Sequence, residues 1–116
     1  MRQRVPLPKR NIPTQARQSI ERIVAVYRPD KVILFGSYSR GKAKTDSDID
    51  VLVIKQRPKE HRLVDRIGRI LEIVPFGTPI EPLVLTPSEV EARLQAGDFF
   101  IQEILASGTI LYEKPS

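Results

Sequence analysis

Residues 31–54 read KVILFGSYSRGKAKTDSDIDVLVI, in which two short apolar runs flank a small, polar and basic segment. The runs Lys31–Phe35 and Ile49–Ile54 have the length and composition of buried strands. The intervening residues 36–45 are rich in Gly, Ser and Lys, which indicates a loop with at most one helical turn. A strand–loop–strand unit is therefore the centre of the fold that we expect.

Helix and strand patterns alternate on both sides of this unit. Apolar residues recur at i, i+3, i+4 and i+7 within 14–27 and share one face over 59–74, which predicts two amphipathic helices. Residues 80–85 and 109–112 indicate two further short strands. A capping box (Thr86, Glu89) starts a third helix, and Asp98 can cap a fourth that ends near residue 106. This order predicts an α/β (α+β) fold, with a small mixed sheet flanked by helices in one domain over 14–113.

Three smaller expectations concern packing. Pro82 cannot donate a hydrogen bond to a neighbouring strand, so its strand should lie at a sheet edge or bulge there. His61 is expected to be solvated on the polar side of its helix. Apolar residues near the C-terminus follow helical spacing and are expected in the core; they are Phe99, Phe100, Ile104 and Leu105.

The composition limits the chemistry that is open to this chain. It has 116 residues, no cysteine and one histidine, which excludes disulfides, iron–sulfur clusters and thiolate zinc sites. A metal would be held mainly by oxygen, which favours Mg²⁺ or Mn²⁺. No apolar run of about 18 residues exists, and the basic N-terminus lacks the apolar stretch of a secretory signal. We therefore expect a soluble, cytoplasmic protein without membrane association.

The positive charge is concentrated at the N-terminus. The net charge is +5, and residues 1–18 contain basic side chains but no acid. Prolines favour an extended chain, so we expect residues 1–13 to form a flexible basic arm. The arm could contact nucleic acid or an acidic partner, or it could be a solvated tail. So few scattered charges favour the tail.

The loop after the first strand carries residues that suit phosphate binding. Gly36 and Gly41 allow a ligand to approach the backbone closely, and Ser37 adds a hydroxyl donor. Arg40 could neutralise a phosphate or orient a carboxylate. Taken alone, this segment is more typical of an ordinary Gly-Ser turn.

Acidic residues enter two of the predicted strands. Asp48 and Asp50 are two residues apart, so in a strand they point to the same side. They repel each other unless a cation lies between them, and Mg²⁺ bound with substrate phosphates suits such ligands. Glu81 adds a third acid, and three acids on neighbouring strands could hold two ions for an in-line phosphoryl displacement. The alternatives are a polar turn before the strand and an exposed Glu81 on an edge strand.

A specific resemblance rests on two blocks of sequence and the spacing between them. The blocks are Gly36-Ser37-x-x-Arg40-Gly41 and Ser47-Asp48-Ile49-Asp50. They resemble the signature of the DNA polymerase β-like nucleotidyltransferase superfamily. Because the chain is short, it is similar above all to the minimal nucleotidyltransferases (MNT), the antitoxin partners in HEPN/MNT toxin–antitoxin pairs. The resemblance covers about residues 14–112 and implies the nucleotidyltransferase fold.

The resemblance also implies roles for the loop residues. Gly36 and Ser37 would hold the β- and γ-phosphates of a nucleoside triphosphate. Arg40 would orient the loop or an acid, and Gly41 would complete the nucleotide-binding loop.

For the acids, the resemblance implies metal binding and catalysis. Asp48 and Asp50 would bind two Mg²⁺ ions, for which Mn²⁺ could substitute. Glu81 would be the third carboxylate and would help to deprotonate the attacking hydroxyl. Glu81 stands where such proteins usually have Asp, and Pro82 follows it, so this position departs from the family pattern.

The expected activity is Mg²⁺-dependent transfer of AMP from ATP, or of another NMP from its NTP, onto a hydroxyl with release of pyrophosphate. By resemblance, the acceptor would be a tyrosine of a cognate HEPN toxin, which the modification would silence in the manner of a type VII-like antitoxin. The alternative is a catalytically silent antitoxin that neutralises its partner by contact. A nucleic-acid module using the basic arm is a third hypothesis, and a homo- or hetero-oligomer is left open.

Overall fold

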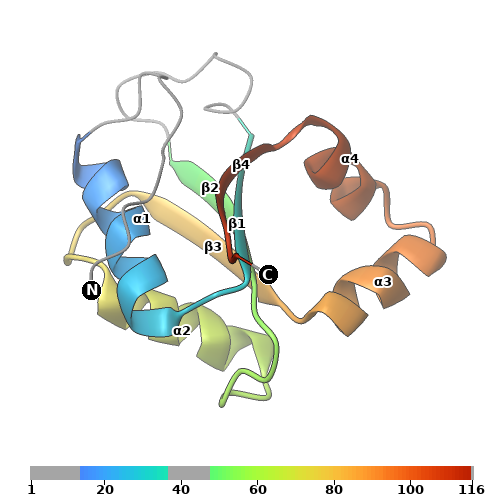
Figure 1. Ribbon diagram of the computed structural model, residues 1–116, viewed down its shortest axis with the longest axis horizontal. Coiled ribbons are helices and arrows are strands. Elements are labelled where there is room, and N and C mark those ends of the chain that lie inside the picture. Colours follow the sequence, from blue (N-terminus) through green and yellow to red (C-terminus); the bar gives the residue numbers. More distant parts are fainter. Residues whose placement is uncertain (1–13, 37–47, 116) are drawn as a thin grey trace.

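The fold is built on a four-stranded mixed sheet with helices on both faces (Figure 1). The computed structural model describes residues 14–36 and 48–115, except the side chain of Gln15. The strand order is β3-β2-β1-β4; β1 runs antiparallel to β2 and β4, and β2 runs parallel to β3. No helix within the described residues is long and apolar enough to cross a membrane. The elements are α1 (Thr14–Tyr27), β1 (Lys31–Phe35), β2 (Ile49–Ile54), α2 (Leu63–Ile73), β3 (Ile80–Leu85), α3 (Pro87–Gln95), α4 (Phe99–Ser107) and β4 (Thr109–Glu113).

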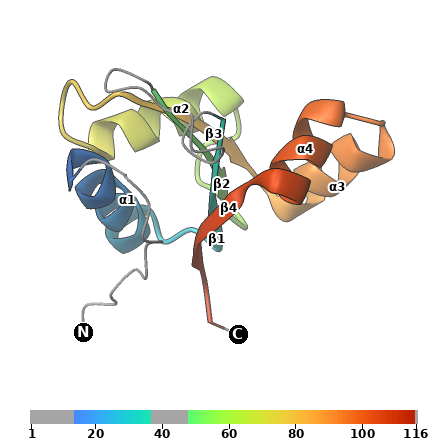
Figure 2. The same ribbon diagram turned by 90° about the horizontal axis from the view of Figure 1, so that it is seen from above.

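The helices form two unequal layers. Helices α1 and α2 cover one face of the sheet, and α3 and α4 lie on the other (Figure 2). Alternation along β2 sends Ile49, Val51 and Val53 into the core under α1 and α2, and Leu52 into the core under α3 and α4. Among the described residues, the first core has 16 buried members and the second has 6. The layer of α3 and α4 therefore covers its sheet face less completely.

Most of the predicted elements are confirmed. Helix α1 and strands β1, β2 and β3 have the predicted boundaries. Thr86 and Glu89 form the predicted capping box of α3, and Asp98 caps α4. Strand β3 lies at an edge of the sheet, and Pro82 pairs in register with Val51. The prediction that Pro82 marks an edge strand is confirmed.

The second predicted helix begins later than expected. It was predicted over 59–74, but α2 starts at Leu63. The Arg66 side chain donates hydrogen bonds to the backbone carbonyls of Glu60 and His61, which holds this segment in a non-helical conformation. His61 is exposed, as expected, but it precedes the helix and does not lie on its polar side. The later start of α2 is caused by tertiary contacts of Arg66, which the hydrophobic periodicity of the sequence cannot reveal.

Four apolar residues near the C-terminus were predicted to lie in the core, and the prediction is wrong for three of them. Phe99, Phe100 and Leu105 are 82%, 53% and 41% exposed, whereas Ile104 is buried. Helix α4 buries only Ile101 and Ile104. Helical spacing identified an apolar helix correctly, but only the side of α4 that carries Ile101 and Ile104 is buried against the rest of the protein.

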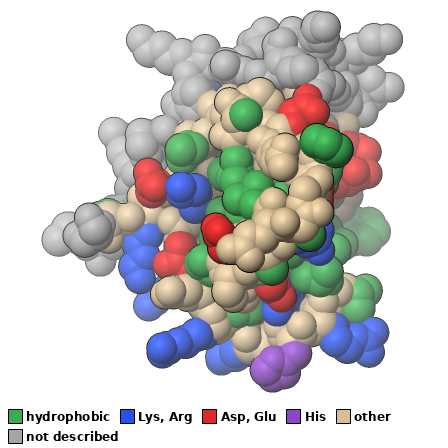
Figure 3. Space-filling view, turned by 90° about the vertical axis from the view of Figure 1, so that its right-hand side faces the viewer, with side chains coloured by type: hydrophobic (Ala, Val, Ile, Leu, Met, Phe, Trp, Pro, Cys, Tyr) green, Lys and Arg blue, Asp and Glu red, His purple; other side chains and the backbone are tan. Residues whose placement is uncertain are grey.

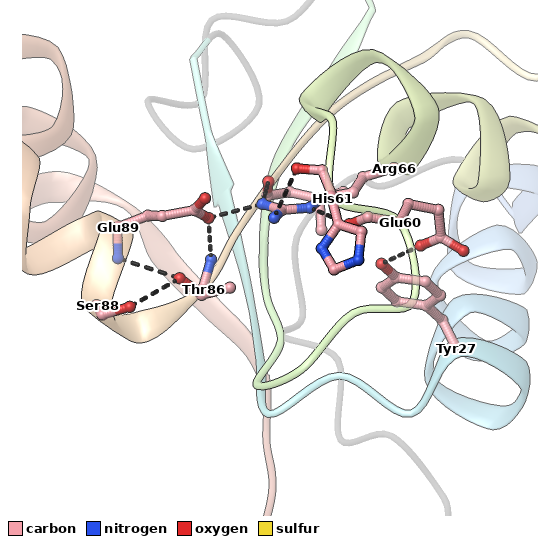
Figure 4. Close-up of polar contacts among 8 residues, drawn as sticks. Tyr27, Glu60, His61, Arg66, Thr86, Ser88 and Glu89 are labelled. Carbon is pink, nitrogen blue, oxygen red and sulfur yellow. Dashed lines mark hydrogen bonds and ion pairs between the residues drawn. The ribbon is translucent and has the colours of Figure 1, made fainter.

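The buried guanidinium of Arg66 connects the helical layers on the two faces of the sheet (Figure 4). Arg66 is 4% exposed, and its Nη1 lies 2.6 Å from Glu89 Oε1 at the start of α3. Its Nε donates to the Glu60 carbonyl at 2.8 Å, and Glu60 in turn accepts from the Tyr27 hydroxyl. Glu89 also accepts from the Thr86 backbone at 2.7 Å. The Arg66 network thus ties α1 and the start of α2 to α3.

We predict that Glu89→Gln destabilises the protein in a pH-dependent way. Burial raises the pKa of Glu89, but the hydrogen bonds from Arg66 and Thr86 and the Arg66 charge outweigh it, so the pKa lies below its ordinary 4.5. The ionised form therefore contributes stability above pH 4.5 that is lost as pH falls through the lowered pKa. At pH 7 the free energy of unfolding should fall by about 1–3 kcal/mol, because a buried cation loses its partner.

Urea denaturation at a series of pH values measures this effect. The curves of Glu89→Gln and the unchanged protein should converge below pH 4.5. Glu91→Gln is the matched control, because Glu91 lies exposed on the same helix and accepts only from Gln95 among the described residues. A loss as large in the control, or a deficit that does not change with pH, would contradict the prediction.

Candidate active site

The register of two parallel strands places two acids side by side. Asp50 on β2 pairs with Glu81 on β3, one step after the pair Ile49 and Ile80. Ile49 and Ile80 point into the core under α1 and α2, so alternation turns Asp50 and Glu81 to the face of α3 and α4. Asp50 is half-buried and Glu81 is exposed. The predicted alternative of an exposed Glu81 on an edge strand is thus also correct, and it coexists with the proximity of the acids.

Gly36 fits against the carboxylate of Asp50. It follows Phe35, which pairs with Asp50, and it has a positive φ of 73°. A Cβ added at Gly36 would collide with Asp50 Oδ2. Glycine is needed here both for its backbone conformation and because the carboxylate occupies the space of a side chain. The predicted approach of a phosphate to the Gly36 backbone stays a prediction; the structure shows the Asp50 carboxylate at this position.

Asp48 completes an acidic cluster at the edge of the sheet. It lies exposed directly before β2. A hydrogen bond with Asp48, then the charges of Asp48 and Asp50, raise the pKa of Glu81 above its ordinary value. Asp48 and Asp50 are therefore close enough to oppose the ionisation of Glu81, an effect that a divalent cation would relieve.

The acidic cluster has the donors for a divalent metal but not a finished coordination site. Carboxylate oxygens are the ligands that Mg²⁺ and Mn²⁺ prefer, and the raised pKa of Glu81 marks excess negative charge. Yet within residues 14–36 and 48–115, no set of three acidic or histidine side chains is already arranged to hold a metal ion. The residues fit a cation chemically, and their oxygens would have to converge on it.

A cavity of about 530 Å³ opens beside the cluster. Its far wall is a stripe of α4 with the spacing i, i+3, i+4 and i+7, formed by Phe100, Glu103, Ile104 and Ser107. The Phe100 ring meets Phe35 edge-on, with centroids 5.5 Å apart. Figure 3 shows this side of the molecule, where hydrophobic and acidic side chains are exposed together. The remaining described lining residues are Gly36, Asp50, Glu81, Pro82 and Leu83.

The sequence analysis missed the contribution of α4 to this cavity. A signal was present, because Glu103 and Ser107 occupy positions on the same helical stripe as Phe100 and Ile104. Polar residues within an apolar stripe can indicate a cavity. Of the predicted site residues, the structure brings together Gly36, Asp48, Asp50 and Glu81. The predicted nucleotide-binding residues Ser37, Arg40 and Gly41 lie outside the described residues.

The fold is that of an α/β domain of the nucleotidyltransferase type. The sequence pattern of the nucleotidyltransferase domain family matches residues 15–111, and the chain belongs to this family. The predicted nucleotidyltransferase domain and its fold are therefore confirmed, whereas membership of the minimal nucleotidyltransferase antitoxins stays a prediction.

Two proteins of Methanocaldococcus jannaschii, each named "putative protein adenylyltransferase", are similar in sequence. One is 37% identical over 89 residues, which are 72% of this chain and 58% of that protein. The chain thus matches less than two thirds of the length of that relative. The other is 29% identical over 85 residues, which are 73% of this chain and 80% of that protein.

Two solved structures share the fold. A nucleotidyltransferase structure from Sulfolobus solfataricus has a TM-score of 0.60 and 21% identity, and covers 86% of this chain and 78% of its own. A toxin–antitoxin structure with AMP-PNP has a TM-score of 0.54 and 15% identity, and covers 88% of this chain and 75% of its own.

We predict that Gly36→Ala is destabilising, although it adds only a methyl group. The positive φ and the collision with Asp50 should together lower the free energy of unfolding by about 1–3 kcal/mol. Gly68→Ala is the control, because a Cβ at Gly68 meets no atom within 4 Å and the residue is inside α2. That change should raise stability by about 0.5–1 kcal/mol. Chemical denaturation at pH 7 measures both, and equal effects would refute the interpretation.

We also predict that Glu81→Gln stabilises the metal-free protein. The raised pKa of Glu81 means that stability falls as pH rises from 4.5 through the raised value. Removing this charge should raise the melting temperature at pH 7 in a chelator and flatten its pH dependence. Mn²⁺ should then raise the melting temperature of the unchanged protein more than that of Glu81→Gln.

Thermal denaturation with EDTA or MnCl₂ provides the measurement. Glu72→Gln, an exposed change on α2, should show neither effect. A lower melting temperature of Glu81→Gln in EDTA at pH 7 would show that the acidic cluster does not carry mutual repulsion.

Proposed function

We propose that this protein is a protein adenylyltransferase that transfers AMP from ATP to a hydroxyl group of a partner protein. The observation that carries the proposal is the pairing of Asp50 with Glu81, with the Gly36 backbone against Asp50, in a nucleotidyltransferase domain. The names of the two Methanocaldococcus jannaschii relatives support the activity. The toxin–antitoxin structure with AMP-PNP supports the choice of a toxin as partner. We propose a tyrosine of a cognate HEPN toxin as the acceptor.

The reaction forms one bond and breaks another at the α-phosphorus of ATP. The hydroxyl oxygen attacks this phosphorus, the bond to the bridging oxygen breaks, and pyrophosphate leaves. Glu81 would take the proton of the hydroxyl, because it is exposed on the edge strand β3. Positioning of the reactants and neutralisation of charge supply most of the rate acceleration in such transfers.

The acidic cluster and the loop divide the remaining tasks. Asp48, Asp50 and Glu81 would hold two Mg²⁺ ions, or Mn²⁺ in their place. Ions bound there would neutralise phosphate charge and polarise the attacking oxygen. The Gly36 backbone would lie against the nucleotide, and Ser37, Arg40 and Gly41 are proposed to bind its phosphates. Localisation in the cytoplasm is part of the same proposal, since ATP and the toxin would be met there.

The competing hypothesis is an antitoxin that acts by contact alone. Two observations favour it: the described acids do not form a finished metal site, and α4 and β4 expose Phe99, Leu105 and Ile110. Exposed apolar residues of this kind occur at protein interfaces. The contact hypothesis requires no nucleotide, so the two hypotheses differ in what they predict for the mass of the partner.

The test is intact-mass analysis of the toxin encoded in the neighbouring reading frame after incubation with this protein, ATP and Mg²⁺. We predict a mass gain of one or more AMP units that EDTA abolishes. Asp50→Asn should reduce the rate about a hundredfold or more, since it removes charge that neutralises the transition state. Asp65→Asn, an exposed change on α2, should leave the rate unchanged.

Binding of the toxin is measured in parallel. Tight binding that Asp50→Asn leaves intact, without any mass gain from ATP, GTP, CTP or UTP, would replace the adenylyltransferase by the contact antitoxin.

A further inference from the structure

The α4 wall of the cavity has a chemical character that is distinct from the acidic cluster. It presents the aromatic ring of Phe100 and the side chain of Ile104 together with two polar groups, Glu103 and Ser107. On the sheet side, the cavity is lined by the apolar side chains of Leu83 and of Phe35, whose ring touches that of Phe100. We define Phe100, Glu103, Ile104 and Ser107 as the α4 stripe. A ligand between the two walls would meet apolar surface on both sides and polar groups at a few points.

The polar groups of the α4 stripe accept hydrogen bonds. The Glu103 carboxylate makes no hydrogen bond or ion pair with another side chain in the described part of the chain. The Ser107 hydroxyl donates its proton to the Glu103 carbonyl at 2.8 Å, so it is not a donor toward a ligand. A ligand on this wall must therefore bring N–H or O–H donors on a flat, largely apolar body.

Charge excludes phosphate from the α4 stripe. The described lining contains Asp50, Glu81 and Glu103 and no Lys or Arg. A triphosphate would need a cation to approach the first two, and it would be repelled by Glu103, which stands apart on α4. The reacting hydroxyl of an acceptor must lie at the acidic cluster, beside Glu81. The Glu103 carboxylate on the opposite wall would therefore not contact it. What remains is the nucleobase of the nucleotide.

We propose that the α4 stripe is the nucleobase subsite and that Glu103 selects bases with an exocyclic amine. Adenine, cytosine and guanine carry such an amine, whereas uracil and hypoxanthine do not. The ring would pack against Phe100 and Leu83, and the amine would donate to the Glu103 carboxylate. The inference rests on the proposed function, because it takes the bound ligand to be a nucleotide.

Binding measurements separate the base from the phosphates. Dissociation constants of the full chain are measured with MnCl₂ for ATP, purine riboside triphosphate, CTP, UTP, GTP, ITP and inorganic tripolyphosphate. A hydrogen bond to a charged group corresponds to about tenfold or more in affinity. We expect ATP to bind about tenfold more tightly than purine riboside triphosphate. By the same argument, CTP should bind about tenfold more tightly than UTP, and GTP about tenfold more tightly than ITP.

Two variants assign the discrimination to the α4 stripe. Glu103→Gln should reduce each preference to less than about threefold while leaving the affinity for tripolyphosphate unchanged, since the amide is a weaker acceptor of the same shape. Phe100→Leu should weaken all nucleotides alike and leave tripolyphosphate unaffected. Glu91→Gln, on the outer surface of α3, is the control and should behave as the unchanged protein.

The outcomes distinguish this inference from the proposed function. If nucleotides bind but Glu103→Gln keeps the preferences, the nucleobase subsite is wrong and the transfer activity stands. If Glu103→Gln changes only the affinity for the toxin, the α4 stripe belongs to the acceptor site, which also overturns the inference. If neither tripolyphosphate nor any nucleotide binds, both the subsite and the proposed function fail.

Discussion

The in-register pairing of β2 with β3 is the constraint on which the rest of the site depends. Ile49 and Val51 on β2 and Ile80 on β3 are buried under α1 and α2, so the hydrophobic core fixes the register of these two strands. A slip by one residue would turn every side chain of a strand to the other face, and would bury its acid in the core. The position of Asp50 beside Glu81 is therefore set by apolar residues that take no part in chemistry.

The second layer is held differently from the first. The α1 and α2 layer has a continuous apolar core, whereas α3 and α4 bury few residues and gain support from the Arg66–Glu89 pair. Arg66 also holds the residues before α2, so one guanidinium contacts both the segment before α2 and the first turn of α3. The incomplete cover of the second face leaves room for the cavity beside the acidic cluster.

Local sequence patterns were sufficient to predict most helices and strands. They failed where long-range contacts determine a helix boundary or the exposure of a side chain. The boundaries of β1, β2 and β3 follow from short apolar runs, and the α3 and α4 starts follow from their capping residues. The start of α2 depends on Arg66 contacts, and the exposure of Phe99 depends on how much of the sheet α4 covers. The acids could be predicted because the spacing of Asp48 and Asp50 is local. That Glu103 lines the same cavity as Glu81 depends on tertiary packing, and the helical stripe alone gave only a weak signal for it.

The small second core has a consequence for how such a domain can diversify. Side chains of α4 that face the cavity are mostly outside the buried set, so they can change without removing much apolar contact from the fold. The larger apolar core and the cavity thereby lie on opposite faces of one sheet. A lineage could exchange the residues that meet the ligand while the α1 and α2 face continued to keep the acids in register. Substitutions would thus be tolerated more readily on the α4 face than on the α1 and α2 face.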